Sequence, residues 1–115
     1  MWHAGKYSVD GLKAAWQEAA FRQEAITALL LVPCAFFVSD NWMTRCLLVG
    51  SVLAVMVVEL LNTAIELALD RVGEEWHALT KKAKDMGSAA VLITLLWCGM
   101  VWVFALVDRF YQSPI

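Results

Sequence analysis

The sequence predicts an all-α membrane protein that forms a single domain. Hydrophobic residues make up 61% of its 115 residues, well above the roughly 45–50% of a soluble domain. The mean hydropathy is +0.63, and the apolar residues are concentrated in three runs separated by short polar segments. We therefore expect one surface helix followed by three transmembrane helices, all within one domain of residues 1–115.

The charge and the cysteines argue against nucleic-acid binding and redox chemistry. The net charge is −2, and the basic residues form no patch or stripe of the kind that phosphate backbones require. Cys34, Cys46 and Cys98 lie in apolar segments without a CxxC pair, so they are expected to be small buried apolar residues. The polar N-terminal residues contain no apolar h-region, so no cleavable signal peptide is expected.

An amphipathic helix is predicted over about residues 8–24, after an arm of residues 1–7 that has no periodic pattern. Lys13, Gln17 and Glu24 fall on its polar side. Its apolar side carries Leu12, Ala15, Trp16, Ala19 and Ala20. Aromatic and basic side chains on such a helix suit the headgroup region, so we expect it to lie along the membrane surface.

The first membrane span is predicted over about residues 25–38, with the sequence AITALLLVPCAFFV. It is short against the roughly 20 residues that a bilayer core requires, so flanking apolar residues must help to cover the thickness. Pro33 lies inside the span and is expected to kink it, which membrane helices tolerate. The polar segment 39–45 then forms a short connection.

The second span is predicted over about residues 46–70. Its clean apolar part, 46–58, covers only ~20 Å at the usual rise per residue, so the acidic half must approach a membrane face. A polar loop over 71–88 follows, in which Gly73 and Gly87 are expected to break helical structure. The third span is predicted over residues 89–107.

The basic residues predict how these spans are oriented. Of the nine Lys and Arg residues, three precede the first span and four lie in the loop between the second and third spans. Three spans put these two regions on the same side of the membrane, and the side richer in Lys and Arg is cytoplasmic. The acidic end of the second span is expected to open there as well.

Four polar residues share one stripe of the second span. On an ideal helix Glu59, Asn62, Glu66 and Asp70 lie within a narrow arc. Buried polar groups can hold membrane helices together, but three carboxylates repel one another unless a cation or proton intervenes. The pattern therefore favours a functional site, and it fits either proton or cation passage or metal-assisted phosphoryl transfer. Familiar phosphate-binding motifs are absent from the sequence.

Three segments resemble the bacterial integral-membrane diacylglycerol kinase family: EAAFRQE (18–24), VELLNTAIELALDRVGEEWH (58–77) and AKDMGSAAVL (83–92). Their order and spacing also match, over about residues 7–107. The resemblance implies a homotrimeric enzyme of the bacterial inner membrane, which transfers the γ-phosphate of MgATP to the primary hydroxyl of diacylglycerol and forms phosphatidic acid.

The resemblance also implies roles for individual residues. Glu59 would be the catalytic base facing the lipid hydroxyl, and Asn62 would orient it. Glu18 and Glu66 would hold the Mg²⁺ that bridges the ATP phosphates. The residues expected to contact the nucleotide are Glu18, Glu66, Glu75, Trp76, His77, Lys84 and Asp85. The residues expected near the lipid substrate are Trp16, Ala20, Phe21, Arg22, Glu59 and Ser88.

The chain departs from the family pattern at one point. Relatives commonly read W-x-x-E-A-A-F, whereas this sequence reads WQEAAF, one residue shorter. In a continuous helix the deletion would turn everything upstream by about 100° relative to Glu18.

Two alternatives to diacylglycerol kinase remain open from the sequence: an undecaprenol kinase of the same fold, and a small proton- or cation-conducting oligomer. A scaffold without activity would leave the acidic stripe unexplained.

Overall fold

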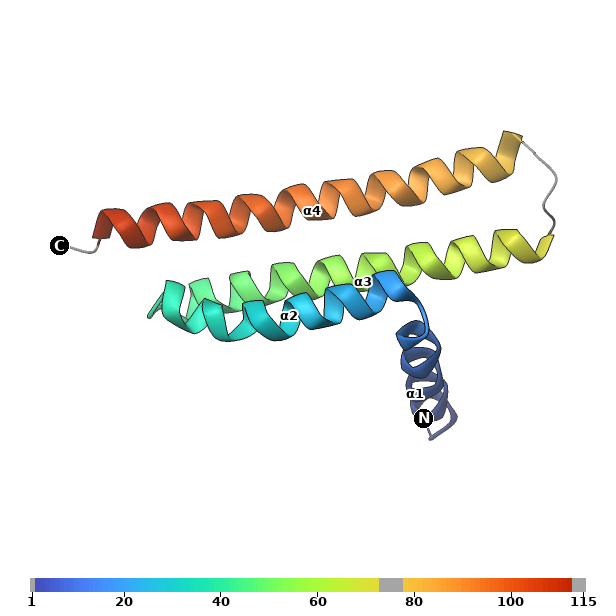
Figure 1. Ribbon diagram of the computed structural model, residues 1–115, viewed down its shortest axis with the longest axis horizontal. Coiled ribbons are helices and arrows are strands. Elements are labelled where there is room, and N and C mark those ends of the chain that lie inside the picture. The colour runs from blue at the N-terminus through green and yellow to red at the C-terminus, as the bar shows by residue number, and fades with distance from the viewer. Residues whose placement is uncertain (1, 73–77, 113–115) are drawn as a thin grey trace.

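A computed structural model describes residues 2–72 and 78–112 as four helices. They are α1 (Trp2–Trp16), α2 (Ala19–Val38), α3 (Trp42–Val72) and α4 (Ala78–Gln112). The helices α2, α3 and α4 lie alongside one another in an elongated body of 60 × 37 × 24 Å, whereas α1 turns away from them (Figure 1). The turn between α2 and α3 and the end of α4 lie at the same end of this body.

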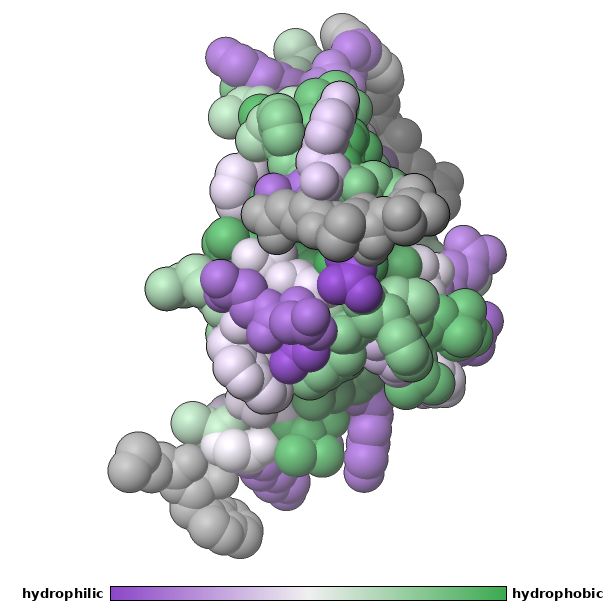
Figure 2. Space-filling model, turned by 90° about the vertical axis from the view of Figure 1, so that its left-hand side faces the viewer, coloured by the Kyte–Doolittle hydropathy of each residue, from purple (hydrophilic) through white to green (hydrophobic). Residues whose placement is uncertain are grey.

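All three predicted spans are confirmed as long apolar helices. The segments Ala19–Val38, Trp42–Val72 and Ala78–Tyr111 are each long and apolar enough to cross a membrane. Large apolar side chains point outward from them, and Figure 2 shows hydrophobic residues exposed around the body when it is viewed from the end with the α2–α3 turn. Such an exposed apolar surface is unfavourable in water and suits contact with lipid or with other membrane helices.

The core lies between α2 and α3. The buried residues of α2 are spaced seven apart at Phe21, Ala28 and Ala35, which places them on one face of the helix. The buried residues in the first half of α3 are Leu48, Ser51, Val52 and Val55. Small residues on α2 let the two backbones approach closely, which is how membrane helices gain packing energy without a hydrophobic effect. Helix α3 also packs along α4, so α3 is the central helix.

The turn between α2 and α3 is fixed by two side chains. Asn41 caps α3, because its Oδ1 accepts hydrogen bonds from the backbone N–H groups of Met43 (2.8 Å) and Thr44 (3.4 Å). Arg45 satisfies the end of α2, since its guanidinium donates to the carbonyl oxygens of Ser39 (2.7 Å) and Phe36 (3.2 Å). These contacts replace the helical hydrogen bonds that the ends of α2 and α3 lack.

The structure corrects the predicted N-terminal region. Helix α1 begins at Trp2, so the predicted arm of residues 1–7 is helical from that point, and the helix predicted over 8–24 is divided in two. Between the two helices Glu18 has an extended backbone, with φ −86° and ψ 125°. The one-residue deletion in WQEAAF falls at this turn, so the phase shift expected for a continuous helix does not apply.

The predicted loop over 71–88 is also shorter than expected. Helix α4 begins at Ala78 and continues through Gly87, which therefore does not break helical structure. The other predicted breaker, Gly73, lies outside the described residues. Helix α2 likewise continues through Pro33. The third span is thus part of a much longer helix than residues 89–107.

Replacement of Arg45 tests the account of the α2–α3 turn. Its guanidinium also stacks over the rings of Phe36 (4.9 Å) and Trp42 (4.7 Å), and its side chain is only 16% exposed. Arg45→Ala should lower the free energy of unfolding by about 2 kcal/mol, because two carbonyl oxygens lose a charged donor. The free energy of unfolding of Arg45→Lys should lie between those of the parent and of Arg45→Ala, since an ammonium group cannot reproduce the forked geometry of the guanidinium. Thermal unfolding in detergent measures this order, and a lysine variant as stable as the parent would contradict it.

Candidate active site

The polar stripe of α3 faces the other helices more than it faces the outside. Asn62 is buried, with 9% of its surface exposed, and Glu59 and Glu66 are half-buried. Asp70, at the end of the stripe, is exposed. The first three groups are therefore held between helices, in the C-terminal half of α3.

Asn62 joins the stripe to α4. Its Nδ2 donates to Oε1 of Glu66, one turn further along α3, at 3.5 Å. Its Oδ1 is buried and has no hydrogen-bond partner among the described residues. The carboxamide lies directly against Gly87 of α4, since a Cβ built on Gly87 would overlap Oδ1 and lie 3.3 Å from Cγ. The two helices approach closely here because Gly87 has no side chain.

Glu24 is a site residue that the sequence analysis missed. It was predicted on the polar side of a surface helix, which is wrong, because it belongs to α2 and turns inward. Its Oε2 is buried without a hydrogen-bond partner in the described part of the chain, and the charge of Glu59 acts on its carboxyl group. The periodicity of α2 could have revealed this position, since Glu24 comes three residues after Phe21 and four before Ala28, both of which are buried.

An apolar cavity of 150 Å³ lies beside Glu24. It is bounded by residues of all three long helices, and the carboxyl group of Glu24 lies at its edge. The residues lining it are Glu24, Thr27, Leu31, Val52, Val55, Met56, Leu95 and Cys98. This space between α2, α3 and α4 could admit an apolar chain from the bilayer while presenting a carboxyl group to its polar end.

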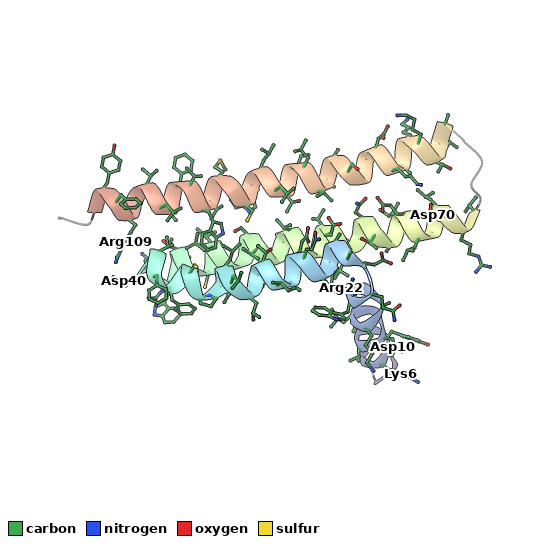
Figure 3. The ribbon with its side chains drawn as sticks, viewed as in Figure 1. Lys6, Asp10, Arg22, Asp40, Asp70 and Arg109 are labelled. Atoms are coloured by element: carbon green, nitrogen blue, oxygen red, sulfur yellow. The ribbon has the colours of Figure 1, made fainter. Side chains whose placement is uncertain are left out.

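The two predicted nucleotide contacts on α4, Lys84 and Asp85, bond to different partners. Lys84 turns toward α3, where its ammonium bonds to Oδ1 of Asp70 at 3.2 Å (Figure 3 shows Asp70 facing α4). Asp85 instead pairs with Lys81, one turn earlier on the same helix, at 2.7 Å. Both pairs are exposed enough for solvent to screen them, so each contributes little to stability and can be exchanged for a ligand.

Glu18 borders a different face of α3 from that of Glu66. It is half-buried at the start of α2, beside a small cavity whose α3 residues are Leu60, Thr63, Ala64 and Leu67. Mg²⁺ is bound in proteins by oxygen ligands, and the carboxylates of Glu18 and Glu66 are of this type, so the donor types fit this cation. The described residues of one chain do not, however, gather three possible metal ligands in one place.

The predicted lipid contacts lie around the α1–α2 turn and the start of α4. Trp16, Ala20, Arg22 and Ser88 are exposed, and Trp16 retains 51% of its surface. Phe21 is buried, with 7% exposed, and packs in the core. The predicted nucleotide contacts Glu75, Trp76 and His77 lie outside the described residues.

Comparison with known proteins shows similarity over nearly the whole chain. Residues 6–106 match the family model of prokaryotic diacylglycerol kinase. The chain is 51% identical over 105 residues to the diacylglycerol kinase of Escherichia coli, a match that covers 86% of each protein. It is 48% identical over 98 residues to that of Haemophilus influenzae, covering 84% of this chain and 83% of the relative. For Pseudomonas aeruginosa the identity is 44% over 101 residues, covering 87% and 82% respectively.

The inward placement of Glu24 can be tested by stability. Glu24→Gln keeps the shape of the side chain and removes one of two like charges from a buried position, so the thermal unfolding midpoint should rise by a few degrees. Glu18→Gln, which removes a carboxylate from the start of the same helix, should leave the midpoint unchanged. A midpoint that falls in Glu24→Gln would show that the Glu24 carboxylate stabilises the fold.

Proposed function

The chain belongs to the prokaryotic diacylglycerol kinase family, and on this premise we propose that it transfers the γ-phosphate of ATP to the primary hydroxyl of diacylglycerol. It is a phosphotransferase with an alcohol acceptor, and the product is phosphatidic acid. The observation that carries this proposal is the burial along the α3 stripe: Glu59 and Glu66 are half-buried on a long apolar helix, whereas Asp70 at the end of the stripe is exposed, so a lipid and a water-soluble nucleotide can meet along it.

The order of Glu59 and Glu66 along α3 matches the order in which the two substrates lie across the membrane interface. Glu59 lies seven residues before Glu66 on α3, about 10 Å deeper along the helix axis. The lipid hydroxyl arrives from the bilayer and ATP from the water, so Glu59 meets the acceptor and Glu66 meets the nucleotide. Holding both substrates in line contributes several kcal/mol to catalysis, because phosphoryl transfer requires little covalent work from the protein.

We assign Glu59 as the general base. Its carboxylate accepts the proton of the lipid hydroxyl as the oxygen attacks the γ-phosphorus, and the bond from that phosphorus to the bridging oxygen breaks to release ADP. Glu24 lies within electrostatic reach of Glu59 and at the edge of the apolar cavity between the three long helices. A second carboxyl group at this point can hydrogen-bond the acceptor headgroup and hold its hydroxyl toward Glu59.

Glu18 and Glu66 are the residues proposed to hold Mg²⁺. When bound, the cation neutralises charge that develops on the phosphate oxygens. Asn62 donates to Glu66 and fixes the direction in which its carboxylate points. Glu18 lies on another face of α3 within one chain, so we propose that Glu18 and Glu66 from different subunits share each site in a homotrimer.

The start of α4 is proposed to bind the nucleotide. Lys84 would exchange Asp70 for the phosphates and offset their charge, and Asp85 would leave Lys81 to contact the nucleotide. The family resemblance also implies nucleotide contacts for Glu75–His77, which lie outside the described residues. We place the start of α4 on the cytoplasmic side of the bacterial inner membrane, because seven of the nine Lys and Arg residues flank the same ends of the spans.

The base assignment is tested with Glu59→Gln. The amide cannot accept the proton, so transfer of labelled phosphate from ATP to diacylglycerol should fall by about 100-fold or more. The thermal unfolding midpoint should stay near that of the parent, because the two side chains have the same shape. Full turnover in Glu59→Gln would remove Glu59 from the role of base.

Asp40→Asn is the matched control. Asp40 is an exposed carboxylate at the opposite end of the body, where it pairs with Arg109 at 3.6 Å (Figure 3). Loss of the Asp40 charge should leave the rate of phosphate transfer within about twofold of that of the parent, since exposed ion pairs contribute little to stability.

The same assay with undecaprenol as acceptor distinguishes a diacylglycerol kinase from an undecaprenol kinase. A measurement of ion flux in vesicles without ATP tests the ion-conducting alternative.

A further inference from the structure

We propose that Gly87 is a positioning residue for phosphoryl transfer: it leaves room for the Asn62 carboxamide in the one orientation that directs Nδ2 toward Glu66. The inference rests on the proposed function, which gives Glu66 a role in binding the cation. Gly87 touches neither substrate. It acts through Asn62, across the contact between α3 and α4.

The geometry leaves no space for a side chain at position 87. Gly87 is buried, and a Cβ on it would overlap Oδ1 of Asn62 and press against Cγ at 3.3 Å. The overlap involves the polar end of a side chain that is itself nine-tenths buried. Any residue other than glycine must therefore turn the carboxamide or push the two helices apart.

Separation of the helices is opposed by the packing between them. Helix α3 packs along α4 more extensively than any other pair of helices in the described part of the chain. Rotation of the carboxamide is thus the easier response, and it breaks the 3.5 Å contact between Nδ2 and Glu66. Groups that orient a metal ligand commonly change metal affinity or activity by about 10- to 100-fold when they are lost.

Other glycines of the long helices are not constrained in this way. A Cβ on Gly50 of α3 or on Gly99 of α4 would meet nothing within 4 Å. Alanine favours helix over glycine, so replacement at these two positions should be neutral or slightly stabilising. Gly99→Ala is therefore a matched control, with the same change twelve residues further along the same helix.

The first experiment compares Gly87→Ala with Gly99→Ala in phosphate transfer to diacylglycerol, with Mg²⁺ varied. Gly87→Ala should raise the Mg²⁺ concentration for half-maximal activity by about tenfold or more. Gly99→Ala should stay within about twofold of the parent in both turnover and Mg²⁺ dependence. A Gly87→Ala enzyme with the Mg²⁺ dependence of the parent would overturn the inference.

The second experiment measures thermal unfolding in a double-mutant cycle and needs no activity. In Asn62→Ala the remaining Cβ lies 4.0 Å from the Cβ of an alanine at position 87, which is ordinary van der Waals contact. Gly87→Ala should therefore lower the unfolding midpoint of the parent, or prevent folding, but leave that of Asn62→Ala unchanged or raise it. Equal losses in both backgrounds, or a double variant that fails to fold when Asn62→Ala folds, would overturn the inference.

The two experiments separate this inference from the proposed function. If Asn62→Ala retains full activity, the role of Asn62 in the site is wrong, and the inference for Gly87 falls with it even when the unfolding cycle shows coupling. If Asn62→Ala loses activity while Gly87→Ala behaves like Gly99→Ala, the proposed function stands and only the inference for Gly87 is wrong.

Discussion

The contact between α3 and α4 at Asn62 and Gly87 is the constraint on which the rest of the site depends. A polar side chain that is buried between two membrane helices needs space and at least one hydrogen-bond partner. Here Gly87 provides the space, and Glu66 accepts one hydrogen bond. With Asn62 fixed, the helical period places Glu59 and Glu66 on the same side of α3. The carboxyl groups proposed to act in the site are thus oriented by packing rather than by a network of charges.

The two ends of the body serve different purposes. At the end with the α2–α3 turn, Arg45 satisfies the carbonyl oxygens of α2, and Asp40 pairs with Arg109 of α4. At the other end α1 diverges from the bundle, and Lys84 with Asp70 bridges α4 and α3. The first end is held both by side chains that bond to backbone and by the Asp40–Arg109 pair, whereas the second end is bridged by an exposed ion pair that a charged ligand can replace. We therefore propose that the substrates bind at the second end.

Much of this arrangement could be predicted from the sequence. Long apolar runs must span a membrane, and the four-residue spacing of Asn62, Glu66 and Asp70 puts them on one side of a helix whatever surrounds it. The inward turn of Glu24 was missed because α2 was taken to begin after it, so its charge was assigned to solvent. Gly87 was misread because glycine weakens an isolated helix, whereas close contact with another helix can require it. Both errors concern partners on another helix, which local propensity does not describe.

We propose that the cation and the nucleotide bind at the level of Asn62 and Gly87. Adding MnATP to protein labelled with ¹⁵N-glycine in detergent tests this placement, since the paramagnetic cation broadens the amide signals of nearby residues. Of these three glycines, Gly87 should broaden most strongly, whereas Gly50 and Gly99 should broaden much less. Gly50 lies twelve residues from Asn62 along α3, and Gly99 lies twelve from Gly87 along α4, about 18 Å in each case. Equal broadening of all three signals, or the strongest broadening at Gly50 or Gly99, would contradict the account.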